Sequence, residues 1–446
     1  MKTALSIAGS DSGAGAGIQA DLKTFAALGL HGCTVITALT SQNTVSVSRI
    51  FEIPGEVVKS QLVSILTDMP PAAAKLGMLY SKEIIAAVVD GLAGAGFPLV
   101  VDPILSAGTG APLLRPDAVG DFIKSIIPMS FAITPNRAEA EYLSGVRISG
   151  EDDTVKAAER IMALGARNVI VKGGHFEQDH AVDLLLTSEN RRVLFSNPRI
   201  EVGETHGSGC NFSAALTAFI AGGMPLEKAC KAANSYVHDA LLNLTRVGSG
   251  LPVTNPLAAL YLDAQKYNVI RDLRAAVRNL VKIRGFGSLV PETQTNFAYA
   301  LPGASKVQEV AAVRGRIVRA GSEVIAVSDV DFAESRHVAA AIVEYMKFDP
   351  TMRSAINMKF DSKVLNACMA SCRVASYDRQ LEPREVKSAE GSSVPWGIRS
   401  ALSDTPAADV IYHTGDVGKE AMTMVFGSNP AEVVDKVTRI STMYSV

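Results

Sequence analysis

The sequence has few cysteines, and their spacing suggests neither a disulfide framework nor a zinc site. The five are Cys33, Cys210, Cys230, Cys368 and Cys372, and no two of them form a C-x-x-C pair. An odd number of cysteines without paired spacing is typical of a reducing compartment. Cys368 and Cys372 are one helical turn apart, but no pair of histidines lies near them in the sequence. We therefore expect them to be core residues rather than metal ligands.

The chain also lacks long apolar segments and an excess of charge of either sign. No apolar run approaches the length of about 20 residues that a membrane-spanning helix needs. The N-terminus reaches a glycine-rich turn without the apolar stretch of a signal peptide. The 43 basic residues nearly balance the 45 acidic ones, which argues against nucleic acid or an anionic membrane as a partner. We expect a cytoplasmic protein that binds neither.

The sequence does contain a regular alternation of short apolar strands and helices. Its 446 residues suggest more than one domain. Over the first 258 residues, strands are expected at 4–8, 34–39, 73–77, 98–102, 131–134 and 168–172, with helices between them. Apolar strands separated by helices of this length predict a mostly parallel sheet covered on both faces, a three-layer α/β/α fold.

The most informative stretch is Thr205-His206-Gly207-Ser208-Gly209-Cys210, which runs into an apolar helix over 214–221. A glycine-rich turn that feeds a helix presents unpaired backbone N–H groups and the positive end of the helix dipole, which suit a transferring phosphoryl group. In the first turn, Cys210 would feel the same field, which lowers the pKa of a thiol. Its thiolate could then accept a proton from a substrate hydroxyl. An ordinary tight loop is the alternative for so short a motif.

Ligands of parallel sheets bind beyond the carboxyl ends of the strands, and polar side chains stand there in this sequence. Asp102 ends one strand, Asn136 and Glu139 follow another, and Lys172-Gly173-Gly174-His175 ends a third. Two carboxylates suit Mg²⁺, and a lysine can neutralise nucleotide phosphates. We expect ATP and Mg²⁺ as cofactors, with Glu139 and Asp102 on the metal. The nucleotide would contact Asp102, Asn136, Lys172 and Thr205, although each alone could be a helix cap or a surface charge.

Residues 1–258 resemble the hydroxymethylpyrimidine (phosphate) kinases of thiamine biosynthesis, which belong to the ribokinase-like superfamily. Many matching sequence motifs occur in the same order over the whole domain. They are Ser6-Ile7-Ala8-Gly9-Ser10-Asp11, Gly17-Ile18-Gln19-Ala20-Asp21-Leu22-Lys23-Thr24, Thr37-Ala38-Leu39-Thr40-Ser41-Gln42-Asn43-Thr44, Lys75-Leu76-Gly77-Met78-Leu79, Thr134-Pro135-Asn136-Arg137-Ala138-Glu139, Lys172-Gly173-Gly174-His175 and Thr205-His206-Gly207-Ser208-Gly209-Cys210.

This resemblance implies a kinase that phosphorylates an alcohol to its monophosphate and then to its diphosphate. It implies Cys210 as the catalytic base or its functional substitute. The anion hole would be formed by the backbone amides of Gly207, Ser208, Gly209 and Cys210.

The resemblance also implies the residues that hold the aminopyrimidine, which are Gly9, Asp21, Gln42 and Met78. Gln42 carries both a donor and an acceptor, which match an aminopyrimidine edge, and Asp21 can accept from the exocyclic amine. Met78 offers a polarizable surface to the ring face. Without the resemblance, Met78 would be taken as core and Asp21 as a surface charge.

The C-terminal part is expected to be a second, smaller α/β domain over 285–446, joined by a helical connector over 259–284. Strands are expected at 316–318 and 324–328 and a helix at 336–346. Trp396, the only tryptophan, lies in a glycine-proline segment and could be a stacking platform or core. The residues of this domain do not by themselves indicate which activity it has.

Several short motifs in this part resemble those of the thiamine-phosphate synthase domain that is often fused to such kinases. They are Gly315-Arg316-Ile317, Ser335-Arg336-His337-Val338-Ala339, Met346-Lys347-Phe348-Asp349-Pro350, Ser376-Tyr377-Asp378-Arg379, Glu390-Gly391-Ser392-Ser393 and Gly418-Lys419-Glu420. The resemblance implies that the pyrimidine diphosphate is joined to thiazole phosphate, with release of pyrophosphate. It implies Arg316 and His337 as catalytic residues.

We interpret Arg316 as a group that grips the departing diphosphate, and His337 as one that holds a phosphate or assists the leaving group. The alternatives are a solvated strand face for Arg316 and a structural role for His337. Gly415-Asp416 departs from the glycine pair expected before Val417, and Ala421 replaces an expected proline.

The sequence therefore predicts a bifunctional enzyme of thiamine biosynthesis, which we expect to be a homo-oligomer. Its partners would be hydroxymethylpyrimidine, the phosphates of that compound, and thiazole phosphate. In a first alternative, the C-terminal domain is a non-catalytic sensor of thiamine phosphates. In a second, the kinase acts on pyridoxal or a related vitamin.

Overall fold

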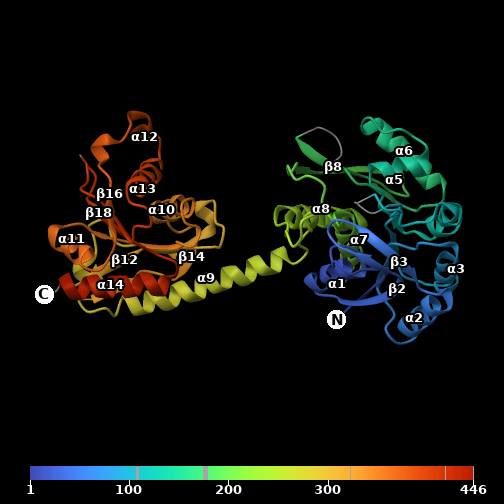
Figure 1. Ribbon diagram of the computed structural model, residues 1–446, viewed down its shortest axis with the longest axis horizontal. Coiled ribbons are helices and arrows are strands. Elements are labelled where there is room, and N and C mark those ends of the chain that lie inside the picture. Colours follow the sequence, from blue (N-terminus) through green and yellow to red (C-terminus); the bar gives the residue numbers. More distant parts are fainter. Residues whose placement is uncertain (107–109, 174–178, 322, 417, 445–446) are drawn as a thin grey trace. The chain divides into compact units, whose positions relative to one another are not determined.

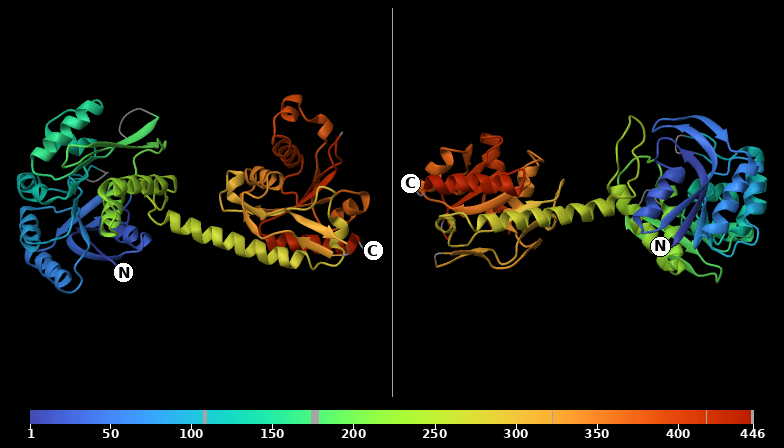
Figure 2. Two further views of the ribbon diagram at one scale, coloured as in Figure 1. Left: turned by 180° about the vertical axis from the view of Figure 1, so that it is seen from behind. Right: turned by 90° about the horizontal axis from the view of Figure 1, so that it is seen from below.

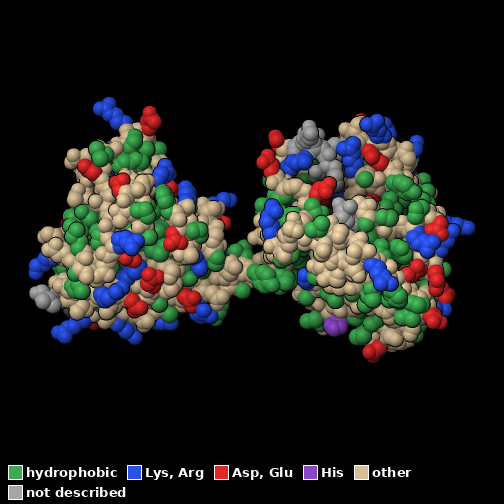
Figure 3. Space-filling model, viewed as in Figure 1, with side chains coloured by type: hydrophobic (Ala, Val, Ile, Leu, Met, Phe, Trp, Pro, Cys, Tyr) green, Lys and Arg blue, Asp and Glu red, His purple; other side chains and the backbone are tan. Residues whose placement is uncertain are grey.

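A computed structural model describes residues 1–106, 110–173, 179–321, 323–416 and 418–444. The chain divides into two compact units, Met1–Tyr261 (unit 1) and Leu262–Val446 (unit 2) (Figure 1). Gly174 and His175, which belong to a motif quoted above, and Val417, also named above, lie outside the described residues. None of the helices in the described part combines the length and the apolar character that a bilayer crossing requires. On the face drawn in Figure 3, acidic and basic side chains are interspersed over both units.

Unit 1 is built on one large sheet, with nine strands among its described residues, in the order β3-β2-β1-β4-β5-β6-β7-β8-β9. The strands from β2 to β7 in that order are parallel, whereas β3, β8 and β9 are antiparallel to their neighbours. Their bounds are β1 Thr3–Asp11, β2 His31–Gln42, β3 Val47–Glu52, β4 Ala73–Leu76, β5 Leu99–Val101, β6 Ala132–Ile133, β7 Val169–Val171, β8 His180–Leu186 and β9 Arg192–Pro198.

Helices cover both faces of this sheet (Figures 1 and 2). Their bounds are α1 Gly17–Ala27, α2 Gly55–Asp68, α3 Lys82–Gly91, α4 Val119–Asp121, α5 Arg137–Ser144, α6 Glu151–Ala163, α7 Ser208–Ala221 and α8 Leu226–Leu242. Side chains along β1 alternate between the two layers. Leu5 packs with the α2 and α3 side, and Ala4 packs with Phe25 and Ala214 of α1 and α7. The predicted three-layer α/β/α fold is confirmed.

Unit 2 begins within helix α9 (Ala258–Leu280). The buried residues of this helix, among them Val269, Leu273 and Leu280, belong to the hydrophobic core of unit 2. They recur at helical spacing, so one stripe of the helix faces that core. The segment expected as a separate connector is therefore part of unit 2.

Unit 2 contains a seven-stranded sheet in the order β14-β11-β10-β15-β18-β17-β16 and a β12-β13 hairpin, counted over the described residues. Among the described strands of unit 2, β16 and β17 pair in parallel and the other pairs are antiparallel. The strands are β10 Phe297–Ala300, β11 Val310–Val313, β12 Ile317–Ala320, β13 Glu323–Ala326, β14 Val330–Phe332, β15 Ser354–Lys359, β16 Val374–Ser376, β17 Val410–His413 and β18 Met422–Gly427. The helices are α10 His337–Met346, α11 Ser362–Met369, α12 Arg384–Ser388, α13 Ser393–Asp404 and α14 Pro430–Tyr444.

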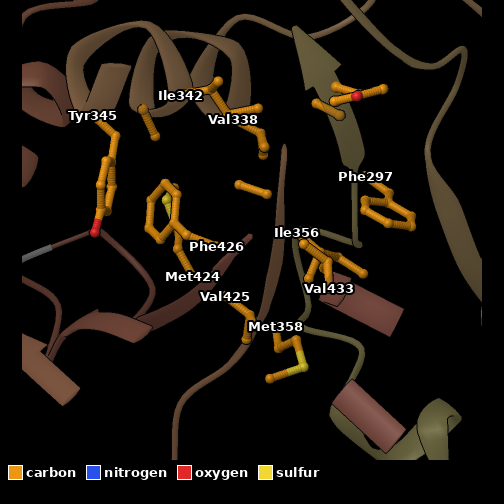
Figure 4. Packing of buried hydrophobic residues seen from close by; sticks show 14 of the residues in the cluster. Phe297, Val338, Ile342, Tyr345, Ile356, Met358, Met424, Val425, Phe426 and Val433 are labelled. Atoms are coloured by element: carbon orange, nitrogen blue, oxygen red, sulfur yellow. The ribbon is translucent and has the colours of Figure 1, made fainter. Parts of the chain in front are cut away.

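Strand β18 is buried on both faces of the unit 2 sheet. Its Met424 and Phe426 lie on the side of α10, where the Phe426 ring is 4.9 Å from the ring of Tyr345 (Figure 4). Val425 points to the opposite face, on which α14 contributes Val433. Helices therefore cover this sheet on both faces, so the second domain is α/β as predicted.

Candidate active sites

A cavity of about 750 Å³ in unit 1 lies at the carboxyl ends of the parallel strands. Its walls come from the ends of β1, β2, β4, β5, β6 and β7 and from the start of α7. This is the edge of the sheet at which such folds bind ligands. The predicted site residues that line it are Gly9, Gln42, Met78, Asp102, Asn136, Glu139, Lys172, Thr205, Gly207, Ser208, Gly209 and Cys210.

The start of α7 forms one wall of this cavity. Gly207 caps the helix with φ +92°, and a β-carbon there would lie 1.9 Å from the carbonyl oxygen of Gly15, so only glycine fits. The first intrahelical bond runs from the Asn211 N–H to the Gly207 oxygen at 2.9 Å. The N–H groups of Ser208, Gly209 and Cys210 precede it and are available to an anion in the cavity.

Cys210 lies in the first turn of α7, but its surroundings do not depress its pKa as the sequence suggested. Burial raises the pKa of the thiol to about 11, and the carboxylates of Asp102 and Asp21 also raise it. The Lys75 ammonium and the Gly17 N–H lower it, without offsetting the burial. The expected low pKa is thus wrong for the folded chain, because removing a thiolate from water outweighs the helix-end field.

Asp21 also requires a correction, because it does not line the cavity. Its side chain is fully buried, and its carboxylate accepts from Lys75 Nζ at 2.5 Å and from Ser6 Oγ at 2.5 Å. Burial alone would lower the pKa of Lys75, but the Asp21 carboxylate raises it, whereas burial raises the pKa of Asp21 and Lys75 opposes that shift. Asp21 therefore acts on the cavity through Lys75, which is one of the lining residues.

Asp102 and Lys172 form an ion pair beside the start of α7, with 2.9 Å between Oδ1 and Nζ. Asp102 also accepts from Ser213 Oγ at 3.1 Å. Burial opposes both charges, but each residue stabilises the other, so the pKa of Asp102 is lowered and that of Lys172 is raised. A β-carbon on Gly209 would lie 3.1 Å from Lys172 Nζ, which places this ammonium next to the anion-binding turn.

Glu139 and Asn136 cap helix α5 reciprocally. Asn136 Oδ1 accepts from the Glu139 N–H at 2.9 Å, and Glu139 Oε2 accepts from the Asn136 N–H at 2.7 Å. Burial raises the pKa of Glu139 to about 7, Lys172 opposes that shift, and Asp102 adds to it. Within the described ranges, no three His, Cys, Asp or Glu side chains are arranged as a metal cluster.

The β1–α1 loop and the α7 motif meet at His206, a residue quoted in the motif above without a role. Its Nε2 lies 2.8 Å from Asp11 Oδ2 and 3.2 Å from Gln42 Nε2. A β-carbon on Gly15 would lie 2.1 Å from the imidazole, so the ring packs directly on that glycine. His206 lines the cavity.

In unit 2, Arg316 lies in the turn between β11 and β12 rather than in the strand expected at 316–318. It has a φ of +74°, directly after Gly315 at +71°. Its guanidinium donates to the carbonyl oxygen of Thr293. Arg314 pairs with Asp331 and Glu334, whereas Arg316 has no acidic partner in the described part of the chain. The exposed guanidinium of Arg316 can therefore receive an anion.

His337 opens helix α10 near four cationic side chains. Partial burial of its ring lowers its pKa, and the charges of Arg316, Lys419, Arg336 and Arg379 lower it further. The structure thus brings Arg316 and His337 together and adds Lys419 and Arg379, to which the sequence analysis gives no role. Both residues belong to motifs quoted above for the resemblance to the synthase domain. Membership of those motifs is the sequence signal that could have identified them.

The loop that carries Lys419 is tied to the Arg316 turn by Glu420. Its two carboxylate oxygens accept from the backbone N–H groups of Glu292 at 2.8 Å and Thr293 at 3.0 Å. Since Thr293 also accepts from Arg316, the segment 292–293 holds both loops. Asp416, which departs from the expected glycine pair, forms an ion pair with Lys387 of α12 at 2.8 Å.

Arg379, His413 and Trp396 lie around one buried tyrosine, Tyr377. The Tyr377 ring is 6.0 Å from Trp396 and 5.1 Å from His413. Trp396 is in helix α13 and is partly buried against the core, so the core interpretation holds for its ring. Burial lowers the pKa of His413 to about 4, and Arg379 adds to that shift. His413 Nδ1 accepts from the Gly415 N–H at 3.1 Å, which requires a neutral ring.

Acidification is expected to destabilise unit 2 through His413. Its folded pKa of about 4 lies below the ordinary 6.5, so its contribution is present above pH 6.5 and is lost as the pH falls toward 4. The loss amounts to about 3 kcal/mol. His413→Asn keeps an acceptor for Gly415 and removes the titration. Denaturant unfolding of the full chain, followed by Trp396 fluorescence at pH 7 and pH 4.5, measures the difference. An equal acid loss in both proteins contradicts the assignment.

Unit 1 has the architecture of small-molecule kinases. It resembles a Bacillus subtilis pyridoxal kinase in an ADP complex, with a TM-score of 0.54, 33% identity and coverage of 58% of this chain and 99% of that one. It also resembles a Staphylococcus aureus pyridoxal kinase in complex with AMP-PCP and pyridoxal, with a TM-score of 0.53, 32% identity and coverage of 58% and 94%.

The chain belongs to the phosphomethylpyrimidine kinase family, whose family model matches residues 11–255. A second family model, thiamine-phosphate synthase ThiN, matches residues 272–439. A Rhizobium meliloti hydroxymethylpyrimidine/phosphomethylpyrimidine kinase is 46% identical over 55% of this chain and 93% of its own length. The bifunctional thiamine biosynthesis protein ThiDN of Methanocaldococcus jannaschii is 30% identical over 99% of both chains. The predicted bifunctional class, a kinase followed by a thiamine-phosphate synthase, is confirmed.

Proposed function

We propose that unit 1 uses ATP to phosphorylate 4-amino-5-hydroxymethyl-2-methylpyrimidine to its monophosphate and then to its diphosphate. Unit 2 then joins that diphosphate to thiazole phosphate and releases pyrophosphate. The observation that carries the kinase part is a single cavity in which the aminopyrimidine residues and the phosphate residues meet at the start of α7. The match of the full chain to a bifunctional thiamine biosynthesis protein supports the presence of both activities in one chain.

At the nucleotide end, Lys172, Asn136 and Thr205 are proposed to hold the phosphates of ATP, because all three line the cavity beside α7. The related kinases solved with ADP and with AMP-PCP support a nucleotide here. The N–H groups of residues 208–210 would receive the transferring phosphoryl group, on which negative charge is already spread over three oxygens.

The donor set also fits Mg²⁺. Asp102 and Glu139 are neighbouring buried carboxylates, and Glu139 uses only Oε2 for its cap. Mg²⁺ is usually bound by one or two carboxylates together with substrate phosphates, so two suffice. When bound there, the ion would neutralise phosphate charge, while Glu139 and Asp102 orient it.

At the acceptor end, Gln42, Met78 and Gly9 are proposed to hold the aminopyrimidine. A β-carbon on Gly9 would lie 2.9 Å from the Met78 sulfur, so glycine leaves the ring room beside the thioether. Cys210 would take the hydroxyl proton in the first phosphorylation, with the buried Lys75 stabilising the thiolate.

In unit 2, the cluster of Arg316, His337, Lys419 and Arg379 is proposed to bind the two phosphorylated substrates. Arg316 would grip the departing diphosphate, and Lys419 and Arg379 would hold the remaining phosphate groups. His337 has a lowered pKa, which favours the neutral ring, so it can accept a proton or a hydrogen bond near the leaving group.

A comparison of acceptors tests the kinase. The purified chain is given ATP and Mg²⁺ with either the aminopyrimidine alcohol or pyridoxal, and product is measured by chromatography. The proposal requires kcat/KM to favour the pyrimidine. Preference for pyridoxal would support the second candidate, which the solved pyridoxal kinases of the same fold raise.

Replacement of Lys172 by methionine is expected to raise the KM for ATP about tenfold, since a charge-assisted bond to phosphate is worth about 1.5 kcal/mol or more. Lys172→Arg should retain much of the affinity because it keeps the charge. Lys156→Met, at an exposed position on α6, serves as the matched control. Unchanged nucleotide affinity in Lys172→Met, measured by calorimetric titration, would remove Lys172 from the site.

A further inference from the structure

A chain of polar contacts runs along the acceptor wall of the unit 1 cavity, from Asp11 through His206 to Gln42 and Thr40. The Asp11 carboxylate is 2.8 Å from His206 Nε2, which is 3.2 Å from the Gln42 carboxamide. The other terminal atom of that carboxamide is 3.2 Å from Thr40 Oγ1. Whether each group donates or accepts a hydrogen bond limits the role of the next group in the chain.

Asp11 fixes the state of the imidazole. Its carboxylate accepts backbone N–H groups from Gly13 at 2.8 Å, Gly15 at 3.0 Å and Ala16 at 2.8 Å. Burial raises its pKa, but the bonds from His206 and the loop amides outweigh this effect and hold the pKa below its ordinary value. An ionised carboxylate needs a donor at 2.8 Å, so His206 carries a hydrogen on Nε2 whether its ring is neutral or protonated.

That hydrogen decides which end of Gln42 faces His206. An Nε2 that carries a hydrogen has no lone pair for a carboxamide NH₂, so the Gln42 atom at 3.2 Å is assigned as the oxygen, which shares the Nε2–H with Asp11. The oxygen and nitrogen of an amide are distinguished only by such networks. The far end agrees, because Thr40 gives its one hydroxyl hydrogen to the Ser10 oxygen at 2.9 Å. Thr40 Oγ1 therefore offers a lone pair to Gln42, and the amide NH₂ belongs there.

We propose that His206 and Thr40 lock the Gln42 carboxamide in one orientation and so make it selective for an amino group beside an unprotonated ring nitrogen. The oxygen keeps one lone pair and the nitrogen one hydrogen for the cavity, which match that edge as a carboxamide matches adenine. This inference rests on the proposed function, in which Gln42 holds the aminopyrimidine. His206 is then a positioning residue for specificity.

The 4-oxo analogue of the substrate presents the reverse pattern, an acceptor beside a ring N–H. To bind it, Gln42 would have to rotate its amide, which would place two donors against each other at His206. At the other end, the Thr40 hydroxyl would have to turn toward the Gln42 oxygen and leave the Ser10 oxygen without its hydrogen. A site built for one hydrogen-bond pattern rejects the reversed pattern because buried polar groups are left unpaired.

The backbone and the ring of His206 are both held in place by their neighbours. Its backbone N–H donates to the Pro252 oxygen at 2.9 Å, and its own oxygen accepts from the Thr254 N–H at 3.1 Å. The ring packs on Gly15, which no larger residue could replace without moving it. The lock is therefore held by segments 11–16 and 252–254 on either side.

The test measures kcat and KM for the 4-amino and 4-oxo pyrimidine alcohols with saturating ATP in three proteins. His206→Phe removes the donor, and we expect the preference for the amino compound in kcat/KM to fall about tenfold or more, the size of one discriminating hydrogen bond. The change should lie mainly in KM. His206→Gln restores an N–H close to the position of Nε2 and should restore most of the preference. His31→Phe, at an exposed position at the start of β2, is the matched control.

An unchanged preference in an active His206→Phe protein overturns the lock. If that variant does not fold, Thr40→Val removes the acceptor at the other end, and an unchanged preference there overturns it equally. A wild-type enzyme that fails to phosphorylate the 4-amino alcohol at all overturns the proposed function instead, and the lock with it. Loss of ATP affinity in His206→Phe without a change in acceptor preference indicates a structural role and also overturns the lock.

Discussion

Arg316→Ala is expected to lower the rate of thiamine phosphate formation by about 10²–10³, the cost of losing one preorganised donor to a developing anion. The reaction mixture contains pyrimidine diphosphate, thiazole phosphate and Mg²⁺ without ATP, so that only unit 2 is measured. The guanidinium is exposed and has no acidic partner among the described residues, so its loss removes a group that faces the substrates. Kinase activity should remain unchanged.

The backbone of Arg316 allows a sharper version of this experiment. At φ +74° an arginine is strained and glycine is not. Arg316→Gly should therefore be as inactive as Arg316→Ala while its unfolding free energy is equal to or higher than that of the parent. Arg319→Ala, on the neighbouring hairpin strand, is the matched control and should keep full activity.

The outcomes separate the two interpretations of unit 2. Loss of product in both Arg316 variants, with folding retained, supports the synthase. Absence of product from the parent chain, with an active kinase, would favour the sensor of thiamine phosphates. Full activity in Arg316→Gly would exclude Arg316 from the chemistry.

Cys210→Ala is expected to slow the first phosphorylation by about 10²–10⁴, the range of a positioned general base. The second phosphorylation should suffer less, because its nucleophile is a phosphate that is already ionised at neutral pH. The two steps are separated by supplying either the alcohol or its monophosphate with ATP. Equal loss in both steps would contradict the role of Cys210 as a base.

The raised pKa of Cys210 gives this role a second signature. Burial raises the pKa to about 11, so the thiolate fraction grows about tenfold with each pH unit below that value. The rate of the first step should therefore rise with pH between 7 and 10, and this dependence should be absent from Cys210→Ala. The second step serves as the internal control and should be flat over the same range.

The sequence predicted the kinase site better than the synthase site for a physical reason. In a parallel sheet the strand ends share one edge, so Asp102, Asn136 and Lys172 could be placed together from their positions alone. Unit 2 is mostly antiparallel, and its cluster comes from the Arg316 turn, the Lys419 loop, a short 3-10 helix at Arg379 and the start of α10 at His337. The contact that joins Glu420 to the 292–293 segment spans more than a hundred residues and follows no periodicity.

Burial explains the corrections in unit 1. Asp21 has the appearance of a surface charge on an amphipathic helix, yet it forms a fully buried pair with Lys75. Cys210 stands at a helix start, a position that favours thiolates in solvent, but burial reverses the shift. Neither effect can be derived from local sequence, because both depend on which distant side chains close over the site.

Helix α9 has a practical consequence for separating the two activities. The resemblance alone would begin the synthase at residue 285, but Val269, Leu273, Ala276, Val277 and Leu280 fill the core of unit 2. A recombinant fragment that starts at 285 would expose the apolar surface these side chains cover and would be prone to aggregate. Stand-alone expression of the synthase should therefore start no later than Leu262, where the compact unit itself begins.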